Sequence, residues 1–149
     1  MEIKKILWPT DFSDSAGKAM NQVISLAEKY RAEVHVLYVI EDLAHHAEWY
    51  GAFEPEHAQK VSDFSMKTAK EKLNQICERY LDGCPLYIRH VAVGDPAAEI
   101  LKLIGAEKMD MVVMATRGAN GQFPFGSVTE KIVRNSEVPV VSVPVGAEG

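Results

Sequence analysis

The sequence predicts an α/β fold, a three-layer α/β/α sandwich around a five-stranded parallel sheet. Strand-like and helix-like segments alternate along the whole chain, and no repeat, low-complexity stretch or linker interrupts them. Alternating strands and helices indicate a parallel sheet covered on both faces, and the right-handed crossover rule leaves few arrangements. The length of 149 residues fits one domain, so we expect a single domain over residues 1–149.

The first unit is a strand followed by an amphipathic helix. Residues 3–8 form a short apolar run that Pro9 stops. From residue 13 to residue 31 apolar side chains recur at helical spacing, and Ser13 suits the N-cap of that helix. The apolar stripe consists of Ala16, Met20, Val23, Ala27 and Tyr30.

A long loop separates the second strand from the second helix. Residues 33–40 are β-branched and aromatic, which is typical of a strand buried on both faces. Residues 41–57 show no period, so we expect a loop there. An amphipathic pattern then predicts a helix over residues 56–82 that ends at Gly83, because a glycine often follows the last turn of a helix.

Three more strands complete the pattern. They are expected at residues 86–93, 109–114 and 139–145. Asp95 and Pro96 suit the N-cap and the first position of a helix that runs to Gly105. Residues 127–135 read as a short helix before the last strand.

Composition and charge exclude several classes of protein. Lys and Arg number 16 against 21 Asp and Glu, and the formal net charge of −5 argues against generic binding to a nucleic-acid backbone. No apolar run reaches the ~18 residues of a membrane span, and the N-terminus lacks the apolar core of a signal peptide. Cys77 and Cys84 are expected to be free thiols. We therefore expect a cytoplasmic protein without membrane or nucleic-acid partners.

The loop after the fourth strand carries most of the chemical information. Three glycines within residues 116–126 let backbone amides approach a ligand, and the loop ends at a helix N-terminus, where the helix dipole favours an anion. Ser127 adds a hydroxyl donor, and Arg117 is the one cation of the loop. An alternative stays open, since Ser127 and Glu130 match a capping box that would satisfy the same amides from within the helix.

The motifs along the chain resemble those of the universal stress protein family. Nearly the whole chain is covered, and the combination in this order is specific although each piece alone is not. The motifs are Pro9-Thr10-Asp11-Phe12-Ser13, Leu37 to Glu41, Gly94 to Ala97, Met114 to Gly118, Gly126 to Glu130 and Val138 to Val141. The resemblance implies a Rossmann-like fold of the adenine nucleotide alpha hydrolase type, usually dimeric. One branch of the family binds ATP, and another lacks the phosphate loop.

The phosphate loop departs from the pattern of the ATP-binding branch, Gly-x2-Gly-x9-Gly-(Ser/Thr). This chain has Ala115-x2-Gly118-x7-Gly126-Ser127, so an alanine replaces the first glycine and the loop is shorter. The alanine matters only where the backbone needs a positive φ or where a phosphate must pass the methyl group. The second half of the motif, from Gly126 to Thr129, is intact, so the resemblance favours ATP binding.

The resemblance also implies a nucleotide site, carried over residue by residue. Asp11 would lie under the nucleoside, where a carboxylate accepts hydrogen bonds from ribose or adenine, and backbone groups of Val39 would meet the adenine edge. The phosphates would lie on Gly118, Gly126, Ser127 and Val128, with Thr10 and Met114 lining the cleft. The full candidate set is Pro9, Thr10, Asp11, Val39, Met114, Ala115, Arg117, Gly118, Gly126, Ser127, Val128 and Thr129. The expected ligand is ATP, which Mg²⁺ could accompany without a dedicated carboxylate cage.

Other polar clusters indicate a function less clearly. The histidines of the loop at 41–57 lack the fixed spacing of a metal site such as H-E-x-x-H, so we expect a surface loop and no metal site. The aromatic residues of this loop could cover the cleft, contact a partner or pack on the chain's own sheet. His35 and His90 lie within strands and are interpreted as core or edge histidines. No nucleophile, base and orienting group form a recognisable set, so we expect no catalytic residue.

The C-terminal strand, residues 138–145, is apolar on both faces, so it must be central or covered. The resemblance implies that it lies at the sheet edge and pairs with its copy in a second chain. An uncovered apolar edge would promote aggregation, and a two-fold homodimer is a simple way to cover it.

Together with the resemblance, these features predict a dimeric cytoplasmic regulator of the stress response that binds ATP. It is not expected to be an enzyme, and any ATP hydrolysis would be slow because no positioned general base is evident. One alternative is a non-nucleotide interaction module of the same fold that acts through its dimer surface and the loop at 41–57. A remote alternative is an adenylating ATP pyrophosphatase, but residues 10–15 lack both glycines of the Ser-Gly-Gly-x-Asp-Ser loop of that class.

Overall fold

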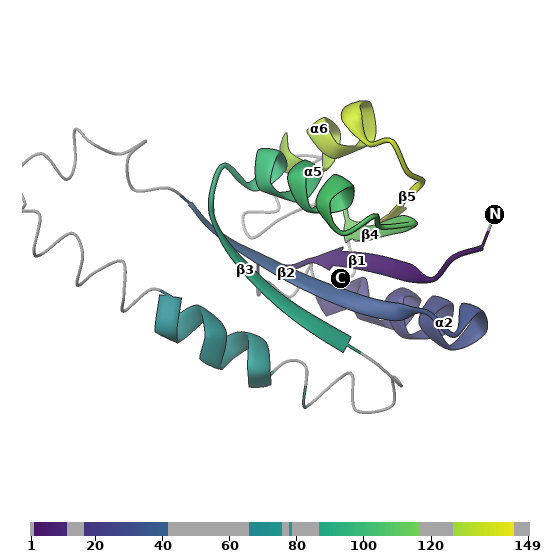
Figure 1. Cartoon of the computed structure of the whole chain (residues 1–149), viewed down its shortest axis with the longest axis horizontal. Coiled ribbons are helices and arrows are strands. Elements are labelled where there is room, and N and C mark those ends of the chain that lie inside the picture. Colours follow the sequence, from purple (N-terminus) through teal and green to yellow (C-terminus); the bar gives the residue numbers. More distant parts are fainter. Residues whose placement is uncertain are drawn as a thin grey trace, which may run out of the picture.

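The computed structural model of the chain describes residues 2–11, 17–41, 66–75, 78, 87–116 and 127–144. Strands and helices alternate as predicted (Figure 1). In chain order the elements are β1 (Lys5–Pro9), α2 (Met20–Tyr30), β2 (Glu33–Glu41), β3 (Tyr87–Gly94), α5 (Pro96–Ala106), β4 (Met111–Ala115), α6 (Ser127–Asn135) and β5 (Val140–Val143), and residues 66–75 form a further helix before β3.

The strands form one five-stranded sheet in the order β3-β2-β1-β4-β5, and every pair is parallel. The predicted parallel sheet is therefore confirmed. The chain fills the sheet outward from β1 through β2 to β3, then returns to the other side of β1 for β4 and β5. The direction of winding reverses between β1 and β4, and in sheets of this kind ligands bind outside the carboxyl ends of the strands at such a point.

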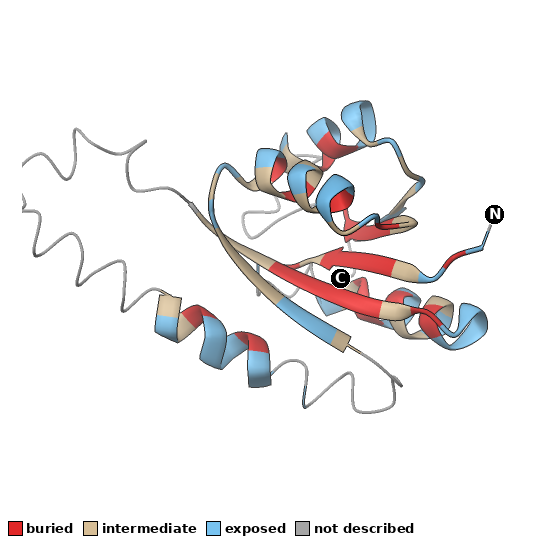
Figure 2. Ribbon diagram, in the orientation of Figure 1, coloured by how far each residue is buried: buried red, intermediate tan, exposed pale blue. Residues whose placement is uncertain are grey.

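Helices cover both faces of the sheet, which confirms the three layers (Figure 1). On one face α2 and the helix before β3 enclose a core that contains Trp8 of β1 and Val23 of α2. On the other face α5 and α6 enclose a core that contains Leu7 of β1, Ile100 of α5 and Ile132 of α6. Successive side chains of a strand point to opposite faces, so β1 contributes to both cores and its buried stretch crosses the middle of the molecule (Figure 2).

The bounds of two predicted helices are tested in part. The regular part of the first helix begins at Met20, after helical residues 17 and 18, and the predicted cap Ser13 lies outside the described residues. Of the helix predicted over 56–82, residues 66–75 and 78 are helical. The remainder of that range lies outside the described residues, as do Gly83 and both cysteines.

One residue predicted to lie in the core, at the end of α2, is exposed in the structure. Met20, Val23 and Ala27 are buried as predicted, but Tyr30 is 44% exposed, so its assignment to the buried stripe is wrong. The reason is the next residue, Arg31, which adopts the left-handed conformation with a φ of 54° and donates its backbone N–H to carbonyls of the last turn. The chain leaves the helix there and turns into β2 before the tyrosine can pack on the sheet.

The helix cap at Asp95 is confirmed. The carboxylate of Asp95 accepts a hydrogen bond from the backbone N–H of Ala98 at 3.0 Å, and Pro96 occupies the first turn. This contact satisfies one of the amides that every helix leaves unpaired at its start. The helix continues to Ala106, one residue beyond the predicted end at Gly105.

The outer strands lie at the two edges of the sheet, β3 on one side and β5 on the other. β5 takes the edge position that the resemblance implies, and it contributes to both cores as predicted: Val143 is buried on the α2 face, and the half-buried Val140 packs on the α5 and α6 face. Within β5, Ser142 is exposed.

Two histidines join β2 to β3 by a side-chain hydrogen bond. His35 is 1% exposed, and its Nδ1 lies 2.9 Å from Nε2 of His90, while its Nε2 lies 3.3 Å from a carboxylate oxygen of Glu33. An ionised carboxylate only accepts, so Nε2 of His35 carries the proton, and its Nδ1 accepts from His90. The interpretation of both residues as satisfied core or edge histidines is confirmed.

The pair predicts how folding stability depends on pH. Burial, and then the electrostatic effect of His35, lower the pKa of His90 below its ordinary value of 6.5, against the opposing effect of Glu107. The unfolded chain then binds a proton at His90 more readily than the folded chain, so this contribution to stability is present above the unfolded pKa and is lost as the pH falls through it. We expect the free energy of unfolding to drop between about pH 8 and about pH 5, and to drop less in His90→Gln.

Urea denaturation of both proteins across this range measures the effect. Glutamine keeps a side-chain N–H that can reach His35 but does not titrate. Equal losses of stability in the wild type and in His90→Gln would show that His90 does not contribute to the pH dependence.

Candidate functional site

The carboxyl ends of β1 and β4 bring several predicted residues to one edge of the sheet. β1 ends at Pro9, with Thr10 and Asp11 directly after it, and the adjacent β4 ends in Met114 and Ala115. β1 and β4 run parallel, with Leu7 opposite Val112, so their carboxyl ends lie side by side. The sequence motifs of the two strands, more than 100 residues apart, therefore meet at the point where the winding of the sheet reverses.

The segment after β1 is held against β2. Thr10 is 7% exposed, and its backbone N–H donates to the carbonyl of Leu37 at 2.9 Å. The last residue of β1 in register with β2 is Pro9, opposite Leu37, whereas β2 continues through Val39 to Glu41. Val39 thus lies beyond the end of β1, at the edge of the sheet where Thr10 and the exposed Asp11 follow β1.

The start of α6 is tied to the end of β4 by a buried hydrogen bond. The hydroxyl of Thr129 donates to the carbonyl of Ala115 at 2.9 Å, and the Thr129 side chain is 3% exposed. Ser127 is exposed at the first position of α6, and Val128 is half-buried. The Thr129 side chain therefore positions the helix, because its hydroxyl proton is directed at the protein's own backbone.

The alanine that replaces the first glycine of the motif causes no backbone conflict. Ala115 is the last residue of β4 and is 8% exposed. Among the described residues, the non-glycine positions with positive φ are Arg31 and Lys108, so Ala115 has an ordinary strand conformation. The backbone therefore does not require a glycine at this position. The remaining condition is the space for a phosphate beside the methyl group of Ala115.

Part of the candidate set lies outside the described residues. This holds for Arg117, Gly118 and Gly126, and also for the loop at 41–57 except the backbone of Glu41. The structure brings together eight members of the set that it describes at the carboxyl edge, with Val39 beside them: Pro9, Thr10, Asp11, Met114, Ala115, Ser127, Val128 and Thr129.

Two buried hydrogen-bond donors near this edge were not anticipated from the sequence. The indole Nε1 of Trp8 and the ammonium group of Lys18 are both buried, and neither has a hydrogen-bond partner. An apolar strand pattern predicts that a tryptophan is buried, but it does not show whether the indole N–H finds an acceptor. A lysine at the start of a helix carries no signal of burial at all.

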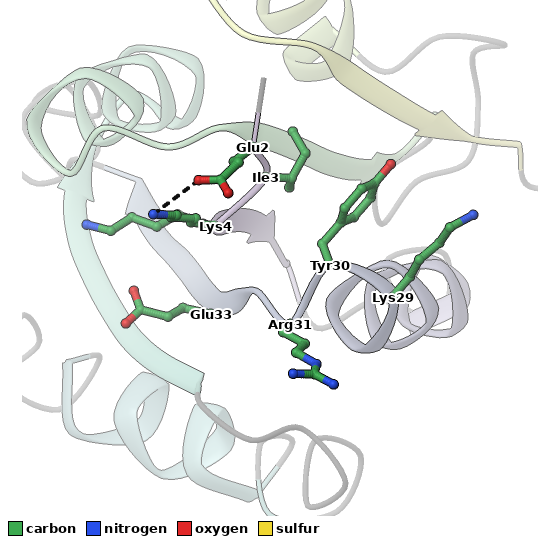
Figure 3. Close-up of a pocket in the computed structure, with 8 residues that line it drawn as sticks. Glu2, Ile3, Lys4, Lys29, Tyr30, Arg31 and Glu33 are labelled. Atoms are coloured by element: carbon green, nitrogen blue, oxygen red, sulfur yellow. Dashed lines mark ion pairs between the residues drawn. The ribbon is translucent and has the colours of Figure 1, made fainter.

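A cavity of about 630 Å³ lies at the opposite, amino edge of the sheet (Figure 3). Its lining consists of Glu2, Ile3, Lys4, Lys5, Lys29, Tyr30, Arg31 and Glu33, and none of the described candidate residues takes part. The ammonium group of Lys4 pairs with Glu2 at 3.2 Å, and that of Lys5 donates to the carbonyl of Glu107 at 3.0 Å. Two of its cations are thus already partnered within the protein, and we assign no ligand to this cavity.

Two further classes of site are absent from the part of the chain that the structure describes. No helix there is both long enough and apolar enough to cross a membrane. No three side chains of His, Cys, Asp or Glu gather there in a way that could hold a metal ion.

Known proteins similar to this chain share its fold over almost the whole of this chain. Universal stress protein MJ0577 of Methanocaldococcus jannaschii is 29% identical over 157 residues, which cover 94% of each chain. Its solved structure has a TM-score of 0.84 and covers 99% of both chains.

Two more distant solved structures contain adenine nucleotides. A universal stress protein in complex with cAMP is 18% identical, with a TM-score of 0.65 and 97% of this chain and 98% of that chain covered. A universal stress protein family member from Arabidopsis thaliana with AMP bound is 17% identical, with a TM-score of 0.63 and 97% and 94% covered. At these identities the likeness shows the fold.

A comparison of the sequence with models of whole protein families shows which family the chain belongs to. The model of the universal stress protein family matches residues 2–144, almost the entire chain. The strand order, the motifs at the ends of β1 and β4 and the start of α6 agree with that match. The chain therefore belongs to the universal stress protein family.

Proposed function

We propose that this protein binds an adenine nucleotide, ATP in particular, at the carboxyl edge of the sheet between β1 and β4, and acts as a regulator rather than a catalyst. The observation that carries the proposal is the hydrogen bond from Thr129 to Ala115, which holds the start of α6 beside the end of β4. The first amides of a helix are unpaired and aligned with its dipole, so they favour an anion such as a phosphate group.

The nucleoside half of the ligand is assigned to β1 and β2. Asp11 is exposed just past the end of β1, where its carboxylate can accept hydrogen bonds from ribose or adenine. Val39 lies on the part of β2 that extends beyond β1, where backbone groups can meet the edge of the base. The AMP and cAMP complexes of two proteins with this fold support the choice of adenine as the base.

The phosphate half is assigned to α6 and the loop before it. Ser127 is exposed at the first position of α6 and can add its hydroxyl to the backbone amides. Arg117, Gly118 and Gly126 complete this half by their place in the motif, and Mg²⁺ would be held by the phosphates. Slow hydrolysis of ATP is the most that we expect, because none of these groups is a positioned general base. We also propose that the protein acts in the cytoplasm, where ATP is abundant.

An interaction module that acts through a homodimer is the second candidate, and the free edge of β5 favours it. Among the described strands β5 pairs with β4 alone. Val133 on the adjacent α6 is 50% exposed. A second copy paired along residues 138–145 would cover this edge. Nucleotide binding and dimer formation do not exclude each other.

The hydroxyl of Thr129 gives a direct test of the nucleotide site. We expect Thr129→Val to lower the free energy of unfolding by about 1–2 kcal/mol, because the Ala115 carbonyl is left buried without its donor. ATP affinity should fall as well, since the start of α6 is no longer fixed. Thr129→Ser keeps the hydroxyl and should keep both properties.

Urea denaturation and calorimetric ATP titration of the three proteins measure these effects. A loss of affinity in Thr129→Val with no loss of stability would mean that the hydroxyl contacts the ligand directly, against its assigned role in positioning the helix.

The edge of β5 gives a test of the dimer. The carbonyls of Pro139 and Val143 accept hydrogen bonds from β4, so the odd-numbered residues face β4 and the backbone N–H of Ser142 points to the free edge. Ser142→Pro removes this N–H without removing a bond to β4. We expect the wild type to sediment as a dimer, Ser142→Pro as a folded monomer, and the control Ser142→Ala as a dimer.

Sedimentation equilibrium and circular dichroism distinguish the outcomes. A dimer that survives in Ser142→Pro would place the interface elsewhere on the chain, and a monomeric wild type would contradict the proposed dimer.

A further inference from the structure

The methyl group of Ala115, which replaces the first glycine of the motif, points to the α2 face of the sheet. Along β4, Val112 and Met114 lie in the core with α5 and α6, whereas Val113 lies in the core with α2. Successive side chains of a strand point to opposite faces. Since β4 continues to Ala115, its side chain lies on the same face as that of Val113.

The neighbouring strand supports this orientation independently. Ala115 is in register with Val143 of β5, and Val143 is buried in the core on the α2 face. Residues in register on adjacent parallel strands point to the same face of the sheet. Ala115 is 8% exposed, so its methyl group is covered on that face.

Other buried side chains close the α2 side of the carboxyl edge. Thr10 is 7% exposed, and its backbone N–H continues the hydrogen bonding of β1 to β2. Its side chain therefore alternates with that of Pro9 and lies on the same face as Trp8, which belongs to the α2 core. Ala19 and Met20, at the start of α2, are 0% and 4% exposed and belong to the same core.

The α6 side of this edge lies across the sheet from those side chains (Figure 1). Val128 and Ile132 of α6 pack in the core on the α5 and α6 face. The Thr129 hydroxyl holds the start of α6 to the carbonyl of Ala115, and Ser127 is exposed there. The methyl group of Ala115 and the first amides of α6 therefore lie on opposite sides of the sheet.

We propose, on the basis of the function proposed above, that the phosphate chain lies entirely on the α6 side of the carboxyl edge. Ala115 helps to close the α2 side against it. A parallel sheet brings the starts of the helices after β1 and β4 to this edge, and the first amides of either helix favour an anion. The phosphates use the start of α6, so the alanine leaves ATP binding intact because its methyl group is not in their path.

Two variants that differ from the wild type by one methyl group test this placement. Ala115→Gly restores the glycine of the motif, and we expect its ATP affinity to stay within about twofold of the wild type. Its unfolding temperature should fall by about 1–4 °C, because glycine is less favourable than alanine in a strand. Gly126→Ala adds a methyl group directly before α6, and we expect about tenfold weaker ATP binding with adenosine binding unchanged.

Calorimetric titration with ATP and adenosine, together with thermal unfolding, measures these effects. Ala32→Gly is the matched control for the loss of a buried methyl group, since Ala32 is 1% exposed and directly precedes the amino end of β2. Ala115→Gly that binds ATP tenfold or more tightly than the wild type and Ala32→Gly would overturn the placement, because the methyl group would then obstruct a phosphate. Gly126→Ala with unchanged ATP affinity would overturn it as well.

Magnetic resonance of the wild type tests the orientation without any variant or ligand. In protein with isotope-labelled methyl groups, the Ala115 methyl group should show nuclear Overhauser contacts to the methyl groups of Val143 and none to those of Val128. Contacts to Val128 in place of Val143 would overturn the orientation on which the placement depends.

Addition of ATP to the same sample shows which side of the sheet the phosphates use. The backbone amides of Ser127 and Val128 should shift, and those of Ala19 and Met20 should stay in place. Larger shifts at Ala19 and Met20 than at Ser127 and Val128 would place the phosphates on the α2 side.

The outcomes separate this inference from the proposed function. ATP binding with shifts on the α2 side would support the proposed function and overturn the inference alone. No heat and no shifts with ATP in the wild type and in Ala115→Gly would contradict the proposed function and the inference with it. ATP binding by Ala115→Gly but not by the wild type would contradict both, because the methyl group would then block the site.

Discussion

The parallel pairing of β1 with β4 is the constraint that creates the candidate site. Strands β2 and β3 lie on one side of β1, and β4 and β5 lie on the other. The winding of the sheet therefore reverses at β1, and the carboxyl ends of β1 and β4 lie side by side there. Thr10 is fixed to β2 through the carbonyl of Leu37, and α6 is fixed to β4 through Thr129. These two contacts fix the segments that the proposed site uses, the end of β1 for the nucleoside and the start of α6 for the phosphates.

Much of the fold could be predicted from the sequence, because apolar periodicity reports which face of an element is buried. Met20, Val23 and Ala27 of α2 follow that periodicity into the core. Tyr30 does not, because the left-handed conformation of Arg31 ends the helix, and neither propensity nor periodicity indicates a non-glycine residue in that conformation. The hydrogen bond between His35 and His90 could not be predicted from the sequence, since it depends on the register of β2 against β3.

For the candidate site, the sequence indicates which residues to consider but not what each of them does in the folded chain. The motifs place Thr129 in the candidate nucleotide site, whereas in the structure its hydroxyl holds α6 against Ala115. Ala115 replaces the first glycine of the motif, but in the structure it has a strand conformation that any residue can adopt. This backbone conformation could not be inferred from the sequence. Trp8 and Lys18 carried no motif, because the absence of an acceptor is a property of the folded surroundings and not of residue type.

The central claim is that the carboxyl edge holds an adenine nucleotide. The most direct measurement is to denature the purified protein, identify any released nucleotide, and titrate the nucleotide-free protein with ATP and Mg²⁺ in a calorimeter. We expect release of an adenine nucleotide, or heat on titration that saturates with one nucleotide per chain. No released nucleotide and no heat at millimolar ATP would contradict it and leave the interaction module as the function of this fold.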